Sequence, residues 1–163
     1  MVPRDKEDWN RILRGGVAAG VFGGVVVGSL LLLADVLDGR DFWLPFKGAS
    51  TPFFGERAMQ PGFDPETVVV GVLAHMAVSI AWGIPFAMLT YGISRGATLV
   101  SGLFWGFIVW IGMYYVLLPM VGLQQIAASE PVGMAISEHV IYGVTVAVGF
   151  LPYQRFKMVL PAH

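Results

Sequence analysis

Two histidines lie inside long uncharged stretches of the sequence, and they are the residues best suited to chemistry. His75 lies about two turns into a predicted helix over residues 67–90, and His139 lies about two turns into another over residues 132–152. If both helices run in the same direction, the two imidazoles share one depth, roughly 10 Å from the helix starts at 1.5 Å per residue. The spacing therefore predicts one layer that contains both imidazoles.

Neighbouring side chains add hydroxyl and carboxyl groups to this layer. Tyr142 and Gly143 share a helix face with His139 at spacings of three and four residues, while Glu138 projects about 100° around the helix. Asp35, near the end of the first hydrophobic stretch, is predicted at a comparable level. Polar groups within a membrane are costly, and most hydrogen-bond to other helices. The first interpretation is therefore a hydrogen-bonded layer without a cofactor.

The same residues could also bind a cofactor. Two histidines from different helices at one depth suit haem b, which makes His75 and His139 candidate haem ligands. Together with Tyr142 and Glu138, they could instead bind a quinone head group or handle protons. The sequence has no cysteine, no Glu-x-x-His and no His-Glu-x-x-His motif, so no metal site is predicted.

The residues of this layer lie in, or directly next to, four stretches that contain no Asp, Glu, Lys or Arg. These stretches cover residues 15–34, 67–94, 96–129 and 139–154. A helix needs roughly 20 apolar residues to cross a hydrocarbon core of ~30 Å. We therefore predict an all-α integral membrane protein, a four-helix bundle with one transmembrane domain over residues 1–163. The expected spans are residues 13–36, 67–90, 97–121 and 132–152.

Composition supports a membrane protein and argues against other classes. The 163 residues are 56% hydrophobic and 13% charged, whereas soluble domains carry about 25% charged residues. The net charge of −1 gives no reason to expect a nucleic-acid partner. Without cysteine there are no disulfides and no thiolate chemistry.

Lysine and arginine are distributed unevenly between the two sides of such a bundle. One side would hold seven of them, whereas the other would hold three, all in the long loop between the first two helices. The seven are Arg4, Lys6, Arg11, Arg14, Arg95, Arg155 and Lys157. The positive-inside rule then predicts cytoplasmic N- and C-termini in the cytoplasmic (inner) membrane, with the long loop outside.

Glycines recur at every fourth position of the first predicted helix. They form overlapping GxxxG units, and a weaker version occurs in the third helix. Such rows let two helix backbones approach closely in lipid. The helix-packing residues are Gly16, Gly20, Gly24, Gly28, Gly102 and Gly106. We expect them to pack within the bundle, and the alternative is an interface with a second copy or another subunit.

The loop between the first two helices is long and aromatic. Aromatic residues gather at the membrane interface, and exposed apolar patches mark partner sites. The loop is therefore expected to lie on the outer leaflet, with a short helix near residues 53–59, or to dock another membrane subunit. The docking candidates are Phe42, Trp43, Phe46, Phe53 and Phe54.

The last helix contains the run SEHVIYGVTVAVGFLPY, in which His139, Tyr142 and Gly143 form an H-x-x-Y-G element. The preceding span ends in YYVLLPMVG, with a corner at residues 119–122. In these two segments the chain resembles small bacterial four-span membrane proteins of unassigned function. The resemblance implies the four-helix plan and no activity.

These observations predict a function that involves no catalysis. No constellation of catalytic residues is visible, whereas packing surfaces are plentiful, so the chain is expected to be an accessory or structural subunit, not an enzyme. Its expected partners are membrane lipids and other integral membrane subunits of a larger complex, plausibly an energy-converting one, and a homo-oligomer stays open. The alternatives are an electron-transfer anchor that binds haem b or quinone, and a small oligomeric transporter or channel.

Overall fold

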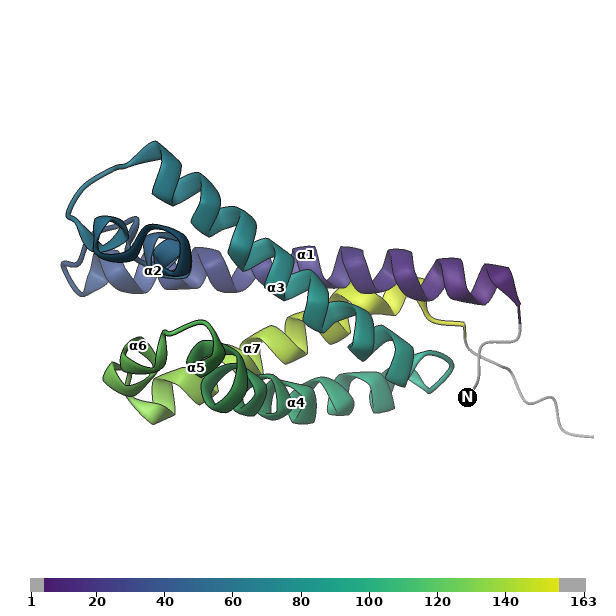
Figure 1. Cartoon of the computed structure of the whole chain (residues 1–163). Helices are drawn as coiled ribbons and strands as arrows, with labels where there is room; N and C mark the ends of the chain where they lie inside the picture. Colours follow the sequence, from purple (N-terminus) through teal and green to yellow (C-terminus); the bar gives the residue numbers. More distant parts are fainter. Residues whose placement is uncertain (1–4, 156–163) are drawn as a thin grey trace, which may run out of the picture.

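The computed structural model describes residues 5–155, and every regular element in that range is a helix (Figure 1). Four long helices run along the molecule. They are α1 (Lys6–Leu37), α3 (Pro65–Thr90), α4 (Arg95–Gly112) and α7 (Val132–Phe150). A π-helical turn, η2 (Met113–Leu117), and the short α5 (Leu118–Met120) extend α4, and the 3₁₀ turn η3 (Leu151–Tyr153) extends α7.

Four of these segments are long and apolar enough to cross a membrane. They are Lys6–Leu37, Pro65–Thr90, Arg95–Met120 and Val132–Tyr153, which confirms four candidate spans in an all-helical chain. The first span begins earlier than expected, because the polar lead is itself helical. Asp5 caps this helix by accepting a hydrogen bond of 2.8 Å from the main-chain N–H of Asp8. Arg4 and Lys157, two charges used to predict orientation, lie outside the described residues.

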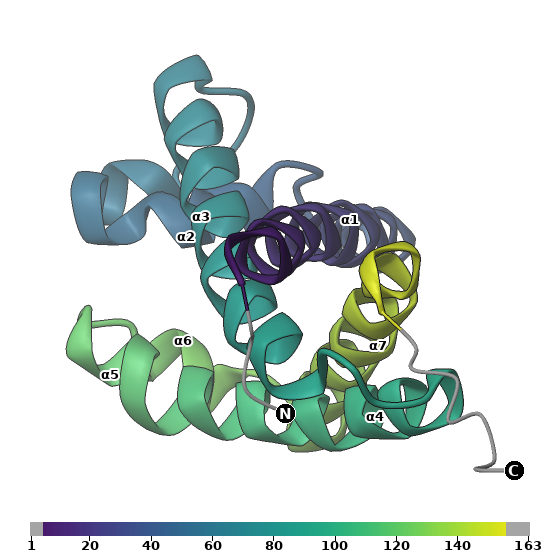
Figure 2. The ribbon, with the colours of Figure 1, turned by 90° about the vertical axis from the view of Figure 1, so that its right-hand side faces the viewer.

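Helix α1 packs on α3 along one side and on α7 along the other, while α4 packs on α7 (Figure 2). Glycines make these approaches close. A Cβ atom at Gly20 would lie 2.7 Å from the Cα of Ile80 in α3, and one at Gly106 would lie 2.5 Å from the Cα of Val140 in α7. Gly16 and Gly24 also face α3, and Gly102 faces α7. The structure thus places the glycine rows between helices of this chain.

A cluster of hydrogen bonds lies at one end of the bundle, here called the terminal end. This end contains the start of α1, the α3–α4 turn and the end of η3. The hydroxyl of Tyr91 donates to Asp8 at 2.7 Å, and Arg155 binds the same carboxylate at 2.9 Å. Gln154 donates to the carbonyl of Thr90 at 2.8 Å and to the hydroxyl of Thr98 at 2.7 Å. Burial, followed by the bond to Asp8, raises the pKa of Tyr91 to about 12.

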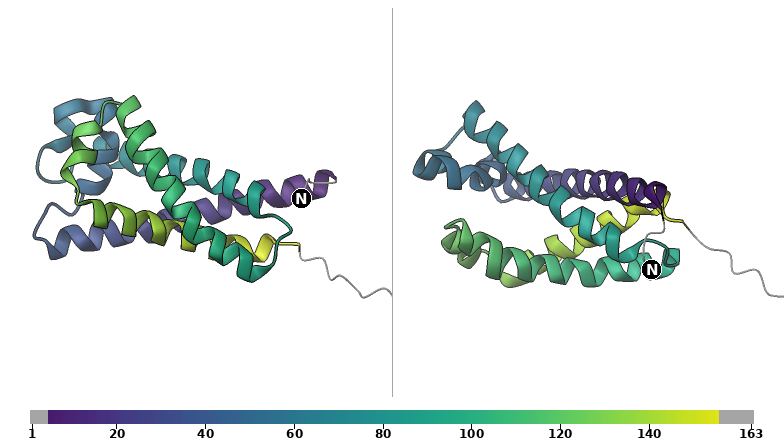
Figure 3. Two further views of the ribbon diagram at one scale, coloured as in Figure 1. Left: turned by 90° about the horizontal axis from the view of Figure 1, so that it is seen from below. Right: turned by 45° about the vertical axis from the view of Figure 1, so that its right-hand side comes forward.

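Helices α3 and α4 diverge from this end toward the opposite one (Figures 1 and 3). At that opposite end, here called the loop end, lie α2 (Leu44–Phe54), the 3₁₀ turn η1 (Gly55–Met59) and α6 (Gln124–Ser129). Near the terminal end, the indole of Trp82 contacts Trp105 with ring centroids 6.0 Å apart, so the space between α3 and α4 is filled there. Helices α3 and α4 lie farther apart near the loop end (Figure 1).

The connection from α1 to α3 differs from the flat loop predicted. Residues 53–59, where a short helix was expected, form the end of α2 and the 3₁₀ turn η1. Helix α2 itself already begins at residue 44, and it packs against α3. Its Lys47 is 1% exposed and binds Asp41 at 2.8 Å and the carbonyls of Gln60 and Gly62. A single buried ammonium therefore holds both ends of the connection, a long-range contact that aromatic content does not reveal.

The connection between the third and fourth spans also contains structure that was not predicted. Residues 122–131 were expected to form a loop, yet six of them form α6. Pro85, by contrast, does not interrupt α3. The π-helical turn η2 widens the third span at the point where it faces α7 and α2, and such turns occur often at functional sites.

Candidate functional site

A cavity of about 450 Å³ lies at the loop end, between α1, α3, the third span and α7, with α2 on one side. Most of its lining is apolar, from residues such as Val27, Leu31, Val78 and Met134. Ionisable side chains from four parts of the chain also reach it. They are Asp35, Arg40, His75, Glu130, Glu138 and His139. An apolar volume of this size with a few convergent polar groups is typical of a binding site for a small molecule.

Asp35 is buried at the end of α1 and pairs with Arg40, which follows the helix. The guanidinium lies 2.6 Å from Asp35 and 3.0 Å from the exposed Asp38. The main-chain N–H of Arg40 also donates to the carbonyl of Asp35 at 2.8 Å, which fixes the turn. The charge of Asp35 is therefore balanced within the cavity wall.

Glu130 and Glu138 form a second acidic group in the lining of the cavity. Their carboxyl groups interact with each other, and the hydroxyl of Tyr114 donates to Glu130. A hydrogen bond between two carboxyl groups needs at least one proton. Burial raises the pKa of Glu130, which lies just before α7.

The imidazole of His75 is fixed by its main-chain partner. Its Nε2 lies 2.9 Å from the carbonyl oxygen of Gly24 in α1, and a Cβ atom at Gly28 would lie 3.3 Å from the same nitrogen. The ring packs edge-on against Phe46 of α2, with centroids 5.7 Å apart. His75 therefore joins α1, α2 and α3 at the cavity.

His139 is fixed within its own helix. Its Nδ1 lies 2.8 Å from the carbonyl oxygen of Ala135, one turn earlier, and its ring packs edge-on against Tyr114 at 5.6 Å. Tyr142, one turn later, donates a hydrogen bond of 2.5 Å to the carbonyl of Ser79 in α3. The structure brings all four predicted site residues, His75, His139, Tyr142 and Glu138, to one cavity.

In metal sites, a histidine usually binds the metal with one nitrogen while the other donates to a carbonyl or carboxylate. Both histidines have one ring nitrogen on a main-chain carbonyl, which is Nε2 in His75 and Nδ1 in His139, and each keeps its second nitrogen. Among residues 5–155 no group of three or more His, Cys, Asp or Glu side chains could hold a metal ion.

The predicted docking residues divide between the surface and the interior. Phe53 is 67% exposed and Phe42 is 40% exposed, while Trp43 and Phe54 are half-buried. Phe46 is a correction, because it is buried against His75 and Gly28 and cannot contact a partner. Its ring lies between α2, His75 of α3 and Gly28 of α1 because α2 packs against α3 and does not lie flat.

Sequence reasoning missed three cavity residues, namely Arg40, Glu130 and Tyr114. Arg40 and Glu130 lie in connections between spans, where helical spacing assigns no direction to a side chain. Tyr114 lies in the π-helical turn, which shifts the register of the residues that follow it. One signal was available in the sequence. Charged residues are rare next to the spans, and those that occur there seldom lack a function.

The fold and this site define an all-helical integral membrane protein with four candidate spans and an acidic cavity between them. The model of a family of unknown function, DUF6789, matches residues 10–157. The chain therefore belongs to this family. No curated protein and no solved structure matches the chain.

Proposed function

We propose that this chain is a non-catalytic membrane protein that binds a lipophilic small molecule with a polar head group in the cavity at its loop end. One observation carries the proposal, namely a cavity of about 450 Å³ that is mainly apolar yet contains three carboxyl groups and two imidazoles. A purely structural bundle would gain stability by filling this space with apolar side chains, because buried polar groups are costly.

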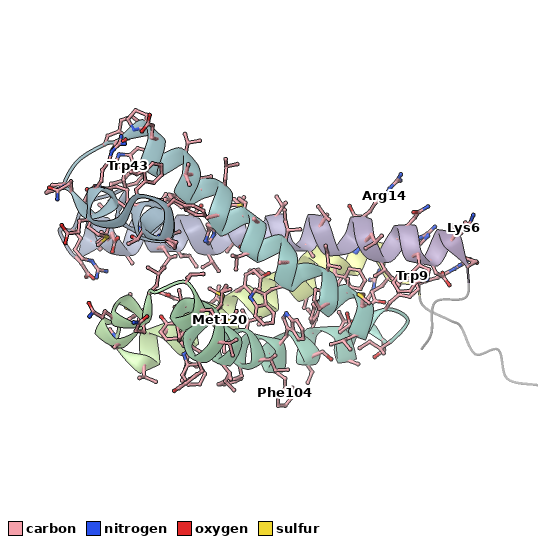
Figure 4. All side chains as sticks on the ribbon, in the orientation of Figure 1. Lys6, Trp9, Arg14, Trp43, Phe104 and Met120 are labelled. Carbon is pink, nitrogen blue, oxygen red and sulfur yellow. The ribbon has the colours of Figure 1, made fainter. Side chains whose placement is uncertain are left out.

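The proposal develops the ligand-binding alternative without haem. It also retains the expectation that the chain works beside a larger membrane complex as an accessory subunit. The observation that favours this second role is the outer face of the third span (Figure 4), where Phe104 is 66% and Tyr115 is 68% exposed. Native electrophoresis in mild detergent tests it, since migration at the mass of a single chain would contradict it.

The proposed orientation has the terminal end in the cytoplasm. Lys6, Arg11, Arg14 and Arg155 are at that end, and α2 and α6 at the loop end then face the other compartment. Single cysteines at Arg11 and Arg57, in a chain that has none of its own, test this by labelling from one side. Equal labelling of both sites by an impermeant maleimide added outside intact cells would contradict it.

A variant that fills the cavity tests ligand binding directly. Gly48 of α2 lines the cavity, and a Cβ atom added there meets no other atom within 4 Å, so we expect Gly48→Trp to introduce a large side chain at the cavity without a clash at its Cβ. Gly96→Trp is the matched control, because its Cβ is equally free and it does not line the cavity.

Native mass spectrometry of the purified proteins gives the readout. We expect a small-molecule adduct on the wild type and on Gly96→Trp, and its loss in Gly48→Trp. The same adduct on all three proteins, or none on the wild type after exposure to a total lipid extract, would contradict the proposal.

A further inference from the structure

The uncharged hydrogen-bond donors that line the cavity are already bonded to acceptors of the chain. Tyr142 donates to Ser79, and Tyr114 donates to Glu130. Ser79 donates to the carbonyl of His75 at 2.8 Å, and the indole N–H of Trp82 points to the sulfur of Met113 at 3.4 Å. A ligand therefore finds few uncommitted donors among these side chains.

The two histidines add acceptors. A carbonyl oxygen can only accept, so the ring nitrogens that face Gly24 and Ala135 must carry the hydrogen. In a neutral imidazole the second nitrogen is then an acceptor, which is Nδ1 in His75 and Nε2 in His139. The polar part of the cavity thus consists largely of acceptors.

Carboxyl groups outnumber cations in the cavity. Arg40 pairs with Asp35 through their contact of 2.6 Å. Glu130 and Glu138 line the same cavity, and among the described residues that line it Arg40 is the sole lysine or arginine. The Glu130–Glu138 pair therefore has no cation of its own in the cavity lining.

We propose that the cavity selects a lipophilic amine, bound as a singly charged ammonium ion whose N–H groups donate to the Glu130–Glu138 pair and whose apolar body lies against α1, α3 and α7. An ammonium ion supplies a second positive charge and uncommitted hydrogen-bond donors beside this pair. A quinone, whose oxygens only accept, suits the site poorly. This inference rests on the proposed function and names its ligand class.

Protection of a single cysteine from alkylation tests the inference. Ala49 lines the cavity, and an Ala49→Cys variant holds the chain's one thiol. In lipid nanodiscs, its rate of reaction with N-ethylmaleimide is measured against decylamine, 1-decanol and decyltrimethylammonium. Leu103→Cys, on the exposed face of α4, reports partition of these probes into the lipid alone.

We expect decylamine to protect Ala49→Cys at a concentration at least about tenfold lower than decanol, since a charge-assisted hydrogen bond is worth about one such factor. Decyltrimethylammonium, which keeps the charge and lacks N–H donors, should fall between them. Combined Glu130→Gln and Glu138→Gln substitutions remove the charge at nearly constant shape and should abolish the preference.

Equal protection by decylamine and decanol would overturn the amine assignment while leaving a ligand cavity in place. Equal protection by decylamine and decyltrimethylammonium would overturn the role of the N–H donors. Protection by none of the three would contradict the proposed function itself. Because these comparisons use the unaltered carboxyl pair, they decide the matter even if the double variant does not fold.

Discussion

The hydroxyl of Tyr142 in α7 donates a hydrogen bond of 2.5 Å to the main-chain carbonyl of Ser79 in α3, 63 residues earlier in the chain. Few other contacts join α3 to α7, because α3 packs mainly on α1 while α7 packs on α4 and α1. This bond therefore fixes one boundary of the cavity, and its tyrosine belongs to the H-x-x-Y-G element of the last helix.

Tyr142→Phe should weaken the packing of α3 against α7. The change removes one buried hydrogen bond and keeps the ring, so we expect a loss of about 1 kcal/mol in the free energy of unfolding. The apparent melting temperature in detergent measures this. Tyr115→Phe, at a tyrosine that is 68% exposed, is the control and should leave it unchanged. Equal melting temperatures for Tyr142→Phe and the wild type would show that the bond does not contribute.

The two members of the Lys47–Asp41 ion pair, in the α1–α3 connection, should differ in how much stability is lost when each is substituted. Asp41→Asn leaves the ammonium of Lys47 almost fully buried without a charged partner, and we expect a loss of about 3 kcal/mol. Lys47→Met removes the buried charge itself and should cost less than half as much. If Lys47→Met proves the more harmful substitution, the three carbonyl and carboxylate contacts of Lys47 matter more than its unpaired charge.

The same ion pair should make the stability of the protein depend on pH in the acidic range. The hydrogen bond from Lys47 holds the pKa of Asp41 below its ordinary value of 3.8. The stabilisation is therefore present above that value and is lost as the pH falls through the lowered pKa. Thermal melts between neutral pH and pH 3 should show this loss in the wild type, and Asp41→Asn should show less of it.

The glycine contacts between α1 and α3 should not tolerate even one methyl group. A Cβ atom at Gly20 would lie 2.7 Å from main-chain atoms of Ile80 and Ser79, so Gly20→Ala must push the two helices apart. Overpacking of this kind costs about 1–3 kcal/mol. Gly96→Ala, near the start of α4 with no atom within 4 Å of its Cβ, is the matched control and should be neutral or stabilising. Similar melting temperatures for the two variants would contradict this packing.

Glu130 should make the bundle less stable as the pH rises. Burial raises its pKa in the folded state above the ordinary 4.5, so its stabilising effect is complete below 4.5 and is lost as the pH rises through the raised value. The loss is at most about 1.4 kcal/mol per pH unit for each proton released. Glu130→Gln cannot ionise, so its melting temperature should fall less between pH 4.5 and pH 8. A parallel fall in both proteins would contradict the buried position of this carboxyl.

Much of the frame was predictable from the sequence, because lipid imposes a simple rule on it. Uncharged stretches of sufficient length gave four candidate spans, and the position of His75 and His139 within them predicted that both imidazoles lie in one layer. These inferences need only the rise of a helix and the cost of buried charge. The glycines at every fourth position likewise pointed to close helix contacts.

The parts that were not predictable depend on contacts between distant residues. Lys47 reaches Asp41 and the carbonyls near Gly62 through a fold of the connection that no periodicity encodes. Glu130 joins Glu138 because α6 and the residues after it return to the bundle. Phe46 turns inward because α2 packs against α3, so part of an aromatic loop that resembled a docking surface is buried against the bundle.

Photolabelling of the native chain in lipid nanodiscs tests the central claim, a ligand site between the spans, most directly. The probe is a decylamine that carries a diazirine at the end of its chain, and the labelled residues are identified by peptide mass spectrometry. The account predicts labels concentrated on residues of the cavity wall such as Val78, Val109 and Met134, which excess unlabelled decylamine removes. Labels spread over outward side chains such as Phe104 and Leu89, unchanged by the competitor, would contradict it.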